Sequence, residues 1–398
     1  MRVRRASTCQ LIVVATMGVV LTACESKSGV DATISKAERP VAQWSLDSIA
    51  LTDIPATGRG GSIRFELVTH AVRLNDATIV VADRVVPTLR FFDSTGRERV
   101  RVGRHGDGPG EFRNVSWLGR CGADTLFAYD PTNRRMTVVT TAAHVVRQFP
   151  WPDSSWMMPE GSQIACSVDG TVAWASRLPN QRPLRSTRDY DSLGRRPANG
   201  RVNSAQGFAS NARLLRPIVL FEIARVGGGP LGVGEGAVPL GRSAMVAVGP
   251  GAVFAGEGEA GFDAFANDGN RQAVLIATSA RTTTSAHYEA SVEEIVARYG
   301  RTTAANVRRT LLALPMPPTL PSYSAILADP SGLAWVVVSA PGDSSTQVRV
   351  FDRLGTPIAV LTTRSMQLLE VGADYALGLY DDDADVQHVA AYRLRKDQ

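Results

Sequence analysis

Short β-branched runs separated by tight turns recur along this chain, and this repeat limits the available folds more than any other feature. The first instance follows Asn75, where residues 78–83 read Thr-Ile-Val-Val-Ala-Asp and residues 89–93 read Leu-Arg-Phe-Phe-Asp. Residues 94–96 read Ser-Thr-Gly, a turn sequence, and residues 97–102 alternate charge and valine. Turn residues between alternating runs predict three antiparallel strands joined in a meander.

The same pattern returns after roughly 45 residues, the period expected of four-stranded propeller blades. Two intervals are nearly double, and we interpret residues 197–245 and 279–322 as insertions. No helical pattern separates consecutive strands within a unit, which argues against a parallel α/β sheet. The sequence therefore predicts an all-β fold, a six-bladed β-propeller of four-stranded antiparallel blades. Later units begin near residues 124, 169, 251, 329 and 375.

Residues 103–112 read Gly-Arg-His-Gly-Asp-Gly-Pro-Gly-Glu-Phe, which raises the question of a phosphate-binding loop. A phosphate cradle needs backbone N–H groups at the start of a helix, but no Gly-Lys-Ser/Thr follows here. A tight turn needs only the positive φ and close backbone approach that glycine allows. We therefore predict an inter-blade turn, with its last residue packed between blades. Its residues are Gly103, Gly106, Gly108, Pro109, Gly110 and Phe112.

Residues 91–96, Phe-Phe-Asp-Ser-Thr-Gly, and the glycine-rich segment 103–112 together resemble the linker between NHL-type repeats. In that family the pattern closes one blade of a six-bladed β-propeller and opens the next. The mature chain resembles the bacterial six-bladed β-propeller lipoproteins with NHL-like repeats, although the motif is complete only after the first blade. The resemblance implies a binding scaffold more often than a catalyst, and it implies no particular ligand.

The N-terminal residues resemble a bacterial lipoprotein signal. Arginines precede an apolar run over residues 11–21, which is too short to span a membrane as a mature helix. Residues 21–24 read Leu-Thr-Ala-Cys, the lipobox pattern, which implies cleavage before Cys24 and lipidation of that cysteine. An ordinary signal peptide with an incidental cysteine is the alternative. We divide the chain into a signal peptide (1–23), a flexible tether (24–40) and the propeller (41–398).

The charge of the mature chain gives no reason to expect a nucleic-acid partner. Loss of the signal's three arginines leaves 40 basic and 38 acidic residues, and no basic stripe is interleaved with aromatic residues. We expect the lipid-anchored protein in the bacterial cell envelope, with the membrane as one partner. Glu25 follows the lipidated cysteine and favours the outer membrane, facing either the periplasm or the surface.

Residues 285–314 predict a small helical insertion in the second long interval. Apolar residues at helical spacing define two stripes, Val292, Ile295, Val296 and Tyr299, then Val307, Leu311 and Leu314. Ser285 is a candidate N-cap and Gly300 a candidate stop, and the proline-rich residues 315–321 predict an extended connector. Two interpretations stay open: the helices pack on the side of the propeller, or they cover one mouth of its channel.

Other motifs give no catalytic or metal residues. Residues 227–232 fit G-x-G-x-x-G, yet further glycines follow instead of the helix that a dinucleotide site requires. The acidic run 381–385 could bind calcium, but it lacks the glycine and glutamate of an EF-hand and fits a solvated loop better. The five histidines show no zinc spacing, and no nucleophile elbow is present. We therefore predict no cofactor, with calcium as the remaining option.

Cys121 and Cys166 remain after processing, 45 residues apart and before matching strands of neighbouring units. Export permits a disulfide between them, but neighbouring blades come within bonding distance only near the propeller axis. Two small buried thiols are the alternative, and the sequence leaves both open.

Two functions fit these observations. The first is a membrane-anchored, extracytoplasmic binding module that contacts an unknown protein or small molecule through loops at one mouth of the propeller. The alternative is an enzyme on the same ring, either a calcium-dependent hydrolase or a zinc-dependent lyase. In both cases the ring must close, since an open blade would expose strand edges. We expect residues 44–51 or 63–68 to pair with the strand that contains Tyr392.

Overall fold

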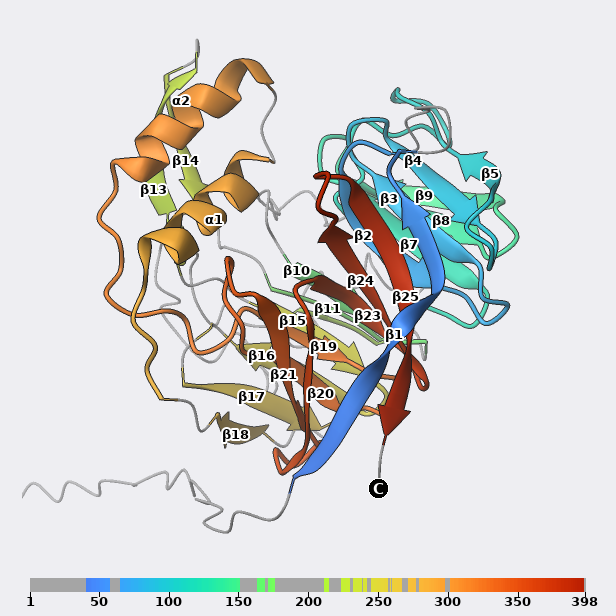
Figure 1. Cartoon of the computed structure of the whole chain (residues 1–398). Helices are drawn as coiled ribbons and strands as arrows, with labels where there is room; N and C mark the ends of the chain where they lie inside the picture. The colour runs from blue at the N-terminus through green and yellow to red at the C-terminus, as the bar shows by residue number, and fades with distance from the viewer. Residues whose placement is uncertain are drawn as a thin grey trace, which may run out of the picture. The chain divides into compact units, whose positions relative to one another are not determined.

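Four-stranded antiparallel sheets recur along the chain in the computed structural model (Figure 1). The first contains β2 (Val68–Arg73), β3 (Ile79–Asp83), β4 (Thr88–Phe92) and β5 (Glu98–Val102). The second contains β6 (Trp117–Arg120), β7 (Thr125–Asp130), β8 (Arg135–Thr140) and β9 (Val145–Pro150). A third contains β15 (Met245–Gly249), β16 (Ala252–Gly256), β17 (Gly261–Ala266) and β18 (Arg271–Leu275). Each is a meander of consecutive strands, as the alternating runs and short turns predict.

The structure describes residues 41–57, 65–150, 163–168, 171–175, 211–214, 223–229, 232–237, 239–241, 245–256, 258, 260–266, 271–276, 279–297 and 301–396. The signal peptide, Cys24 and the tether, with the other residues between these ranges, lie outside the described part.

An eight-stranded sheet combines strands from both ends of the chain. It contains β19 (Ala325–Ala328), β20 (Ala334–Val337), β21 (Ser345–Phe351), β22 (Pro357–Arg364), β1 (Ala42–Pro55), β25 (Gln387–Lys396), β24 (Tyr375–Asp381) and β23 (Gln367–Val371), in that order. β1 pairs in parallel with β22 over its first residues, and antiparallel with β25 along most of its length. Ala50 lies opposite Tyr392, so residues 44–51 are the N-terminal segment that pairs with the last strand.

Two smaller sheets differ from the predicted four-stranded antiparallel blades. One contains β10 (Gln163–Cys166), β11 (Thr171–Ala175) and β12 (Asn211–Leu214), and its β11–β12 pair is parallel. The parallel pair is possible because 35 residues, 176–210, intervene between the two strands, which leaves room for a crossover connection. The other is the hairpin of β13 (Ile223–Gly229) and β14 (Gly232–Ala237). Of the predicted glycine motif, residues 227–229 thus end β13 and Gly232 begins β14, while residues 230 and 231 lie outside the described part.

The first strands of successive sheets form a closed series of contacts. β2 contacts β6, which contacts β10; β10 contacts β15, β15 contacts β19, β19 contacts β23, and β23 returns to β2. Sheets arranged around a common axis, each presenting its first strand to the next, define the β-propeller fold. We call this series the ring of first strands.

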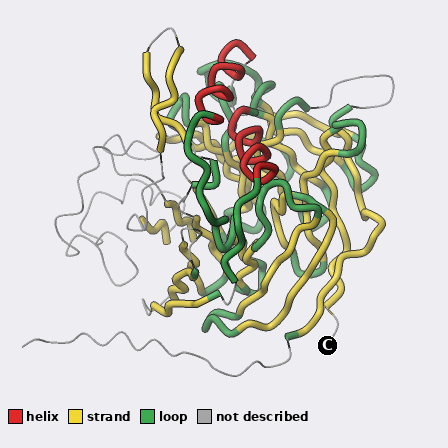
Figure 2. Tube along the Cα trace, turned by 60° about the vertical axis from the view of Figure 1, so that its left-hand side comes forward, coloured by secondary structure: helices red, strands yellow, loops and turns green. Residues whose placement is uncertain are grey.

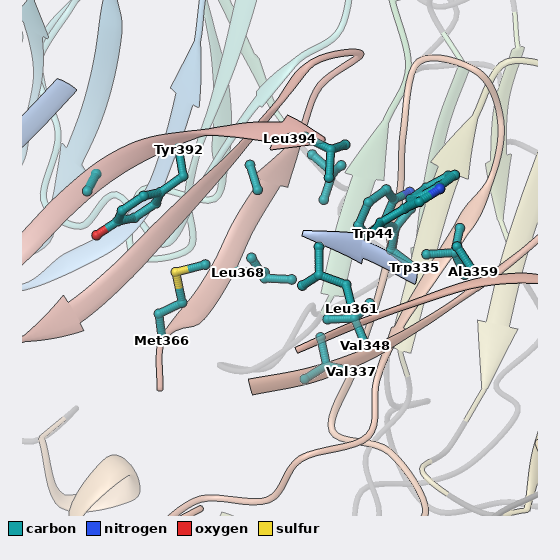
Figure 3. Packing of buried hydrophobic residues seen from close by; sticks show 14 residues of the cluster. Trp44, Trp335, Val337, Val348, Ala359, Leu361, Met366, Leu368, Tyr392 and Leu394 are labelled. Carbon is teal, nitrogen blue, oxygen red and sulfur yellow. The ribbon is translucent and has the colours of Figure 1, made fainter. Parts of the chain in front are cut away.

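Apolar side chains fill the spaces between neighbouring sheets. One cluster joins the sheet of β2–β5 to that of β6–β9 and includes Leu89, Phe112 and Leu126, each fully buried. Another brings Trp44 of β1 to Trp335 of β20, with ring centroids 5.4 Å apart (Figure 3). The described sheets are therefore stabilised by apolar burial both between neighbouring sheets and within the eight-stranded sheet.

The helical insertion consists of α1 (Ser285–Val296) and α2 (Arg301–Leu312). Their buried faces meet in one cluster of Tyr288, Val292, Ile295, Val307 and Leu311, and Val296 and Leu314 of the predicted stripes pack against it. Tyr299 and the predicted stop, Gly300, lie outside the described residues. The N-cap is Thr284, because its hydroxyl accepts from His287 N while the His287 ring accepts from Thr284 N. The prediction of Ser285 as N-cap was therefore wrong by one residue.

The insertion contacts the propeller through the β20–β21 connection. Asp343 of that connection accepts hydrogen bonds from Arg281 and contacts His287 Nε2 at 3.1 Å. Gly342 lies against the first turn of α1, where an added Cβ would approach Ala286 O to 3.2 Å. α2 also lies beside β13 of the hairpin (Figures 1 and 2). The helices thus pack on a loop of the eight-stranded sheet.

Candidate functional site

The glycine-rich segment 103–112 lies in the connection from β5 to β6. Its amide groups already have protein acceptors: Gly106 N donates to Phe112 O, Gly108 N to the Glu111 carboxylate, and Gly110 N to Gln148 Oε1. A phosphate cradle would need those same donors. The segment therefore offers no anion site of that kind.

Packing explains the first glycine of this segment and the phenylalanine that ends it. Gly103 has a φ of 90°, and a Cβ there would lie 2.4 Å from the Phe112 ring. The Phe112 side chain is completely buried. Arg135 of β8 holds the loop from the next sheet by donating to the carbonyl oxygens of Asp107 and Gly108. These contacts join two sheets, which is a structural role.

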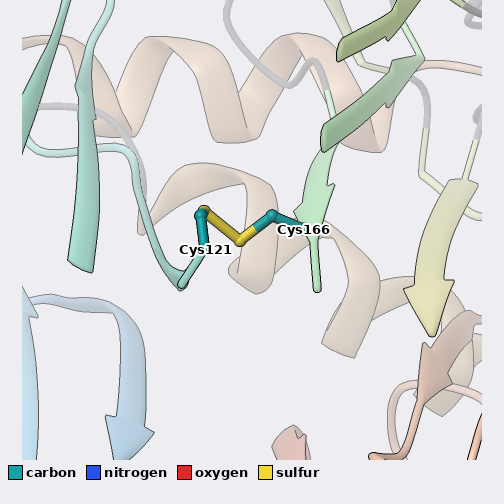
Figure 4. Close-up of a disulfide and its surroundings, with 2 residues drawn as sticks. All are labelled: Cys121 and Cys166. Atoms are coloured by element: carbon teal, nitrogen blue, oxygen red, sulfur yellow. A yellow bond between two sulfur atoms is a disulfide. The ribbon is translucent and has the colours of Figure 1, made fainter. Parts of the chain in front are cut away.

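A disulfide links Cys121 to Cys166, with Cα atoms 5.2 Å apart (Figure 4). Cys121 directly follows β6, and Cys166 is the last residue of β10. The carboxyl-terminal ends of these two first strands therefore meet at one end of the ring. This is the near-axis location that a bridge between neighbouring sheets requires.

Replacing both cysteines, Cys121→Ser with Cys166→Ser, is expected to lower the free energy of unfolding by about 3 kcal/mol, because the bridge restricts a long loop in the unfolded chain. Urea denaturation measures the loss. Reduced wild-type protein is the matched control and should unfold at the same urea concentration as the double variant. Two free thiols per chain in denatured, unreduced protein would contradict the bridge.

A polar cluster lies at the same end of the ring. Arg73 ends β2, Arg120 ends β6, Glu370 is the penultimate residue of β23, and Tyr375 begins β24. Arg120 Nη1 donates to Arg73 O at 3.2 Å, and Arg73 N donates to Glu370 Oε2 at 2.6 Å. These contacts bring three neighbouring strand ends together. We call Arg73, Arg120, Glu370 and Tyr375 the ring-end cluster.

The two arginines of this cluster have one acceptor between them among the described residues, the Arg73 carbonyl oxygen that Arg120 Nη1 contacts. Arg73 and Arg120 each have a buried Nε atom without a hydrogen-bond partner. The Arg73 guanidinium lies over the Tyr375 ring, 4.6 Å from its centroid, and no described residue accepts a bond from it. Both side chains are partly exposed, so their remaining N–H groups are within reach of a ligand.

Burial raises the pKa of Glu370 to about 7, and this effect outweighs the hydrogen bonds from Arg73 N and Tyr375 and the nearby guanidinium charges. Burial also raises the pKa of the Tyr375 hydroxyl, as does its contact with Glu370. A carboxyl group that titrates near neutral pH beside two arginines can hold or release a proton as a ligand binds. The cluster is therefore our candidate functional site.

Glu370 should make the stability of the protein depend on pH. Its pKa in the folded protein lies above the ordinary 4.5, so folding favours the protonated form and stability falls as pH rises from about 4.5 to 7. We expect Glu370→Gln to remove this decline and to be more stable than wild type at pH 8 by about 2 kcal/mol. Thermal unfolding between pH 5 and 8 measures the difference. Glu66→Gln, an exposed glutamate, is the control, and an unchanged slope in Glu370→Gln would contradict the assignment.

Asp381 of the acidic run 381–385 ends β24, and the other residues of the run lie in the turn that leads to β25. Asp382 Oδ1 accepts from the N–H groups of Ala384 and Val386, and its Oδ2 contacts His388 Nε2 at 3.2 Å. His388 Nδ1 contacts Asp53 of β1 at 2.8 Å. The turn therefore helps attach the N-terminal strand to the last sheet.

Two further properties concern membranes and metals. Among the described residues, no group of three or more His, Cys, Asp or Glu side chains has a geometry that could hold a metal ion. Neither of the described helices is long and apolar enough to cross a membrane.

The sequence analysis missed the ring-end cluster. Arg73 and Glu370 are 297 positions apart, and each belongs to a run that reads locally as an ordinary strand. The one available signal was positional, since residues at the ends of the first strands lie near the axis when the units are propeller blades.

No known family model matches the chain, and no curated protein matches it. Solved structures of low sequence identity do match. A DUF4221 family member from Bacteroides vulgatus is 8% identical with a TM-score of 0.50, over 89% of this chain and 99% of that chain. A candidate exported protein from Bacteroides fragilis is 11% identical with a TM-score of 0.47, over 89% and 96%. Virginiamycin B lyase from Staphylococcus aureus, solved with quinupristin, is 9% identical with a TM-score of 0.40, over 89% and 94%. Similarity at these identities concerns the fold alone.

Proposed function

We propose that this protein is a lipid-anchored, extracytoplasmic binding module, built as a six-bladed propeller that holds a small-molecule ligand at the ring-end cluster. The observation that carries the proposal is the pair of arginines at the ring end. Each guanidinium has a buried Nε atom without an acceptor among the described residues, and such unpaired polar groups cost free energy that a bound ligand could offset. Convergent donors of this kind, at the axis of a scaffold, are typical of a ligand site.

Six blades are supported by the way the eight-stranded sheet divides at β1. β19–β22 form one meander, and β23–β25 form another to which β1 adds a fourth strand. With the sheets that begin at β2, β6, β10 and β15, the ring of first strands then has one member for each blade. Closure of the last blade by the N-terminal strand removes its exposed edge.

The lipid anchor rests on the lipobox at residues 21–24 and on the disulfide, which is typical of proteins outside the cytoplasm. Cys24→Ser is expected to abolish incorporation of labelled fatty acid and to release the protein from the membrane fraction. Wild type and Ser26→Ala are the controls and should both be labelled. A Cys24→Ser protein that still carries the label would contradict the anchor.

A thermal-shift screen of small molecules against the mature protein tests the binding site. We expect some compounds to raise the Tm of wild type but not that of the double variant Arg73→Ala, Arg120→Ala. The control variant is Arg101→Ala, which replaces an exposed arginine of β5 and should respond as wild type does. Compounds that stabilise all three proteins equally bind elsewhere. If every stabilising compound behaves in that way, the proposed site is wrong.

An enzyme at the same site is the second candidate, and one observation favours it. Glu370 titrates near neutral pH, as a general acid or base must. The screen separates the two functions, because a bound ligand recovered chemically unchanged after long incubation indicates a binding module. Conversion that is lost in Glu370→Gln indicates catalysis.

A further inference from the structure

The charges of the ring-end cluster do not balance when Glu370 is neutral. The charged and titratable groups that face Glu370 in the described structure are Arg73 from β2, Arg120 from β6 and Tyr375 from β24. No second described carboxylate interacts with it. Two guanidinium charges therefore face a single carboxyl group.

Hydrogen-bond geometry around Tyr375 independently favours a neutral Glu370. The Tyr375 hydroxyl lies 3.2 Å from Arg73 O and 3.0 Å from Glu370 Oε2, but it has only one proton to donate. If Glu370 is ionised, both contacts need that proton. If Glu370 is protonated at Oε2, that oxygen donates to the tyrosine oxygen while it still accepts from Arg73 N, and the tyrosine donates to the Arg73 carbonyl oxygen. Both contacts are then hydrogen bonds.

A neutral Glu370 leaves the two guanidinium groups, in their partly buried setting, without a counter-charge from the described part of the chain. Their planar N–H edges match the oxygens of a carboxylate or a phosphate group, which supply charge and acceptors together. Arg73 is held over the Tyr375 ring and Arg120 by the Arg73 carbonyl oxygen, so both are positioned before a ligand arrives.

We propose that the ring-end cluster is a proton-coupled oxyanion site, in which Arg73 and Arg120 bind the carboxylate or phosphate group of a small molecule while Glu370 holds a proton. The inference rests on the proposed function and names its ligand chemistry. Ionised Glu370 would neutralise one guanidinium and repel the anion, so the site binds tightly at low pH and releases at high pH. With a carboxyl group that titrates near 7, apparent affinity should fall about 10-fold between pH 6 and pH 8.

Calorimetric titration with sodium sulfate and with sodium lactate tests the proposal, because both anions stay fully charged from pH 6 to pH 8. Sodium chloride at matched ionic strength is the baseline, and Arg101→Gln is the control for general salt effects. Saturable binding of sulfate alone indicates a phosphate-bearing ligand, and binding of lactate alone indicates a carboxylate. In either case the affinity for the anion must be about 10-fold lower at pH 8 than at pH 6, and binding must disappear in Arg120→Gln.

Glu370→Gln keeps a neutral group at the site and should bind the same anion equally well at pH 6 and pH 8. This variant keeps the test decisive if Arg120→Gln does not fold. Absence of saturable binding by either anion at pH 6 would overturn the proposal, as would binding that Glu370→Gln leaves equally pH-dependent. A neutral or cationic ligand found by the screen at Arg73 and Arg120 would overturn the oxyanion inference while leaving the binding module intact.

Discussion

Deletion of residues 42–55 is expected to leave a chain that no longer folds cooperatively. These residues form β1, whose pairing with β22 and β25 joins the two halves of the eight-stranded sheet. Their loss exposes both strand edges and removes Trp44 and Ile54 from two buried clusters. Burial of two such side chains contributes on the order of 5 kcal/mol, comparable to the whole stability of a domain. Thermal unfolding followed by circular dichroism measures the effect.

Two controls separate strand pairing from simple shortening. Ile49→Ala changes a β1 side chain that is 81% exposed, so it should leave the transition almost unchanged. Deletion of residues 26–39, which the sequence predicts to be tether, should also leave it unchanged. A cooperative transition near the wild-type Tm in the β1 deletion would show that the ring does not need this strand.

Phe112→Ala is expected to lower the free energy of unfolding by about 4 kcal/mol, the usual cost of emptying a large buried aromatic site. Phe112 is completely buried between the sheet of β2–β5 and that of β6–β9. Its ring occupies the space beside Gly103, where a Cβ cannot fit. The cavity should therefore loosen the packing of both sheets. Urea denaturation gives the change directly.

Arg104→Ala is the matched control in the same connection. The Arg104 side chain is 82% exposed and pairs with Glu111, so its loss should change the unfolding free energy by less than about 1 kcal/mol. A small effect of Phe112→Ala, similar to that of Arg104→Ala, would contradict a packing role and reopen a functional reading of the glycine-rich segment.

The repeating sheets could be predicted from the sequence because their information is local. Strand runs such as 78–83 and 89–93 alternate or are β-branched, and residues 94–96 turn the chain between neighbours. The apolar spacing of residues 292–296 likewise predicts a helix at α1. In both cases the pattern that defines the element lies within the element.

Features that depend on distant partners could not be predicted in the same way. The pairing of β1 with β25 was predicted only from the need to close the ring, and the parallel pairings of β1 with β22 and of β12 with β11 were not predicted. Each of these strand pairings depends on tertiary packing, which local β-propensity does not determine. The ring-end cluster has the same origin, since Glu370 meets two arginines only when β2 and β6 lie beside β23.

A crystal structure of the mature protein with the most strongly stabilising compound from the screen tests the central claim most directly. The account predicts that the compound lies at the ring end, with acceptor atoms within hydrogen-bond distance of the Arg73 and Arg120 guanidinium groups. It also predicts that Glu370 contacts the compound or the Tyr375 hydroxyl at pH 6. A compound bound elsewhere, for example beside α1 or against the His388 turn, with the arginines turned to solvent, would contradict it.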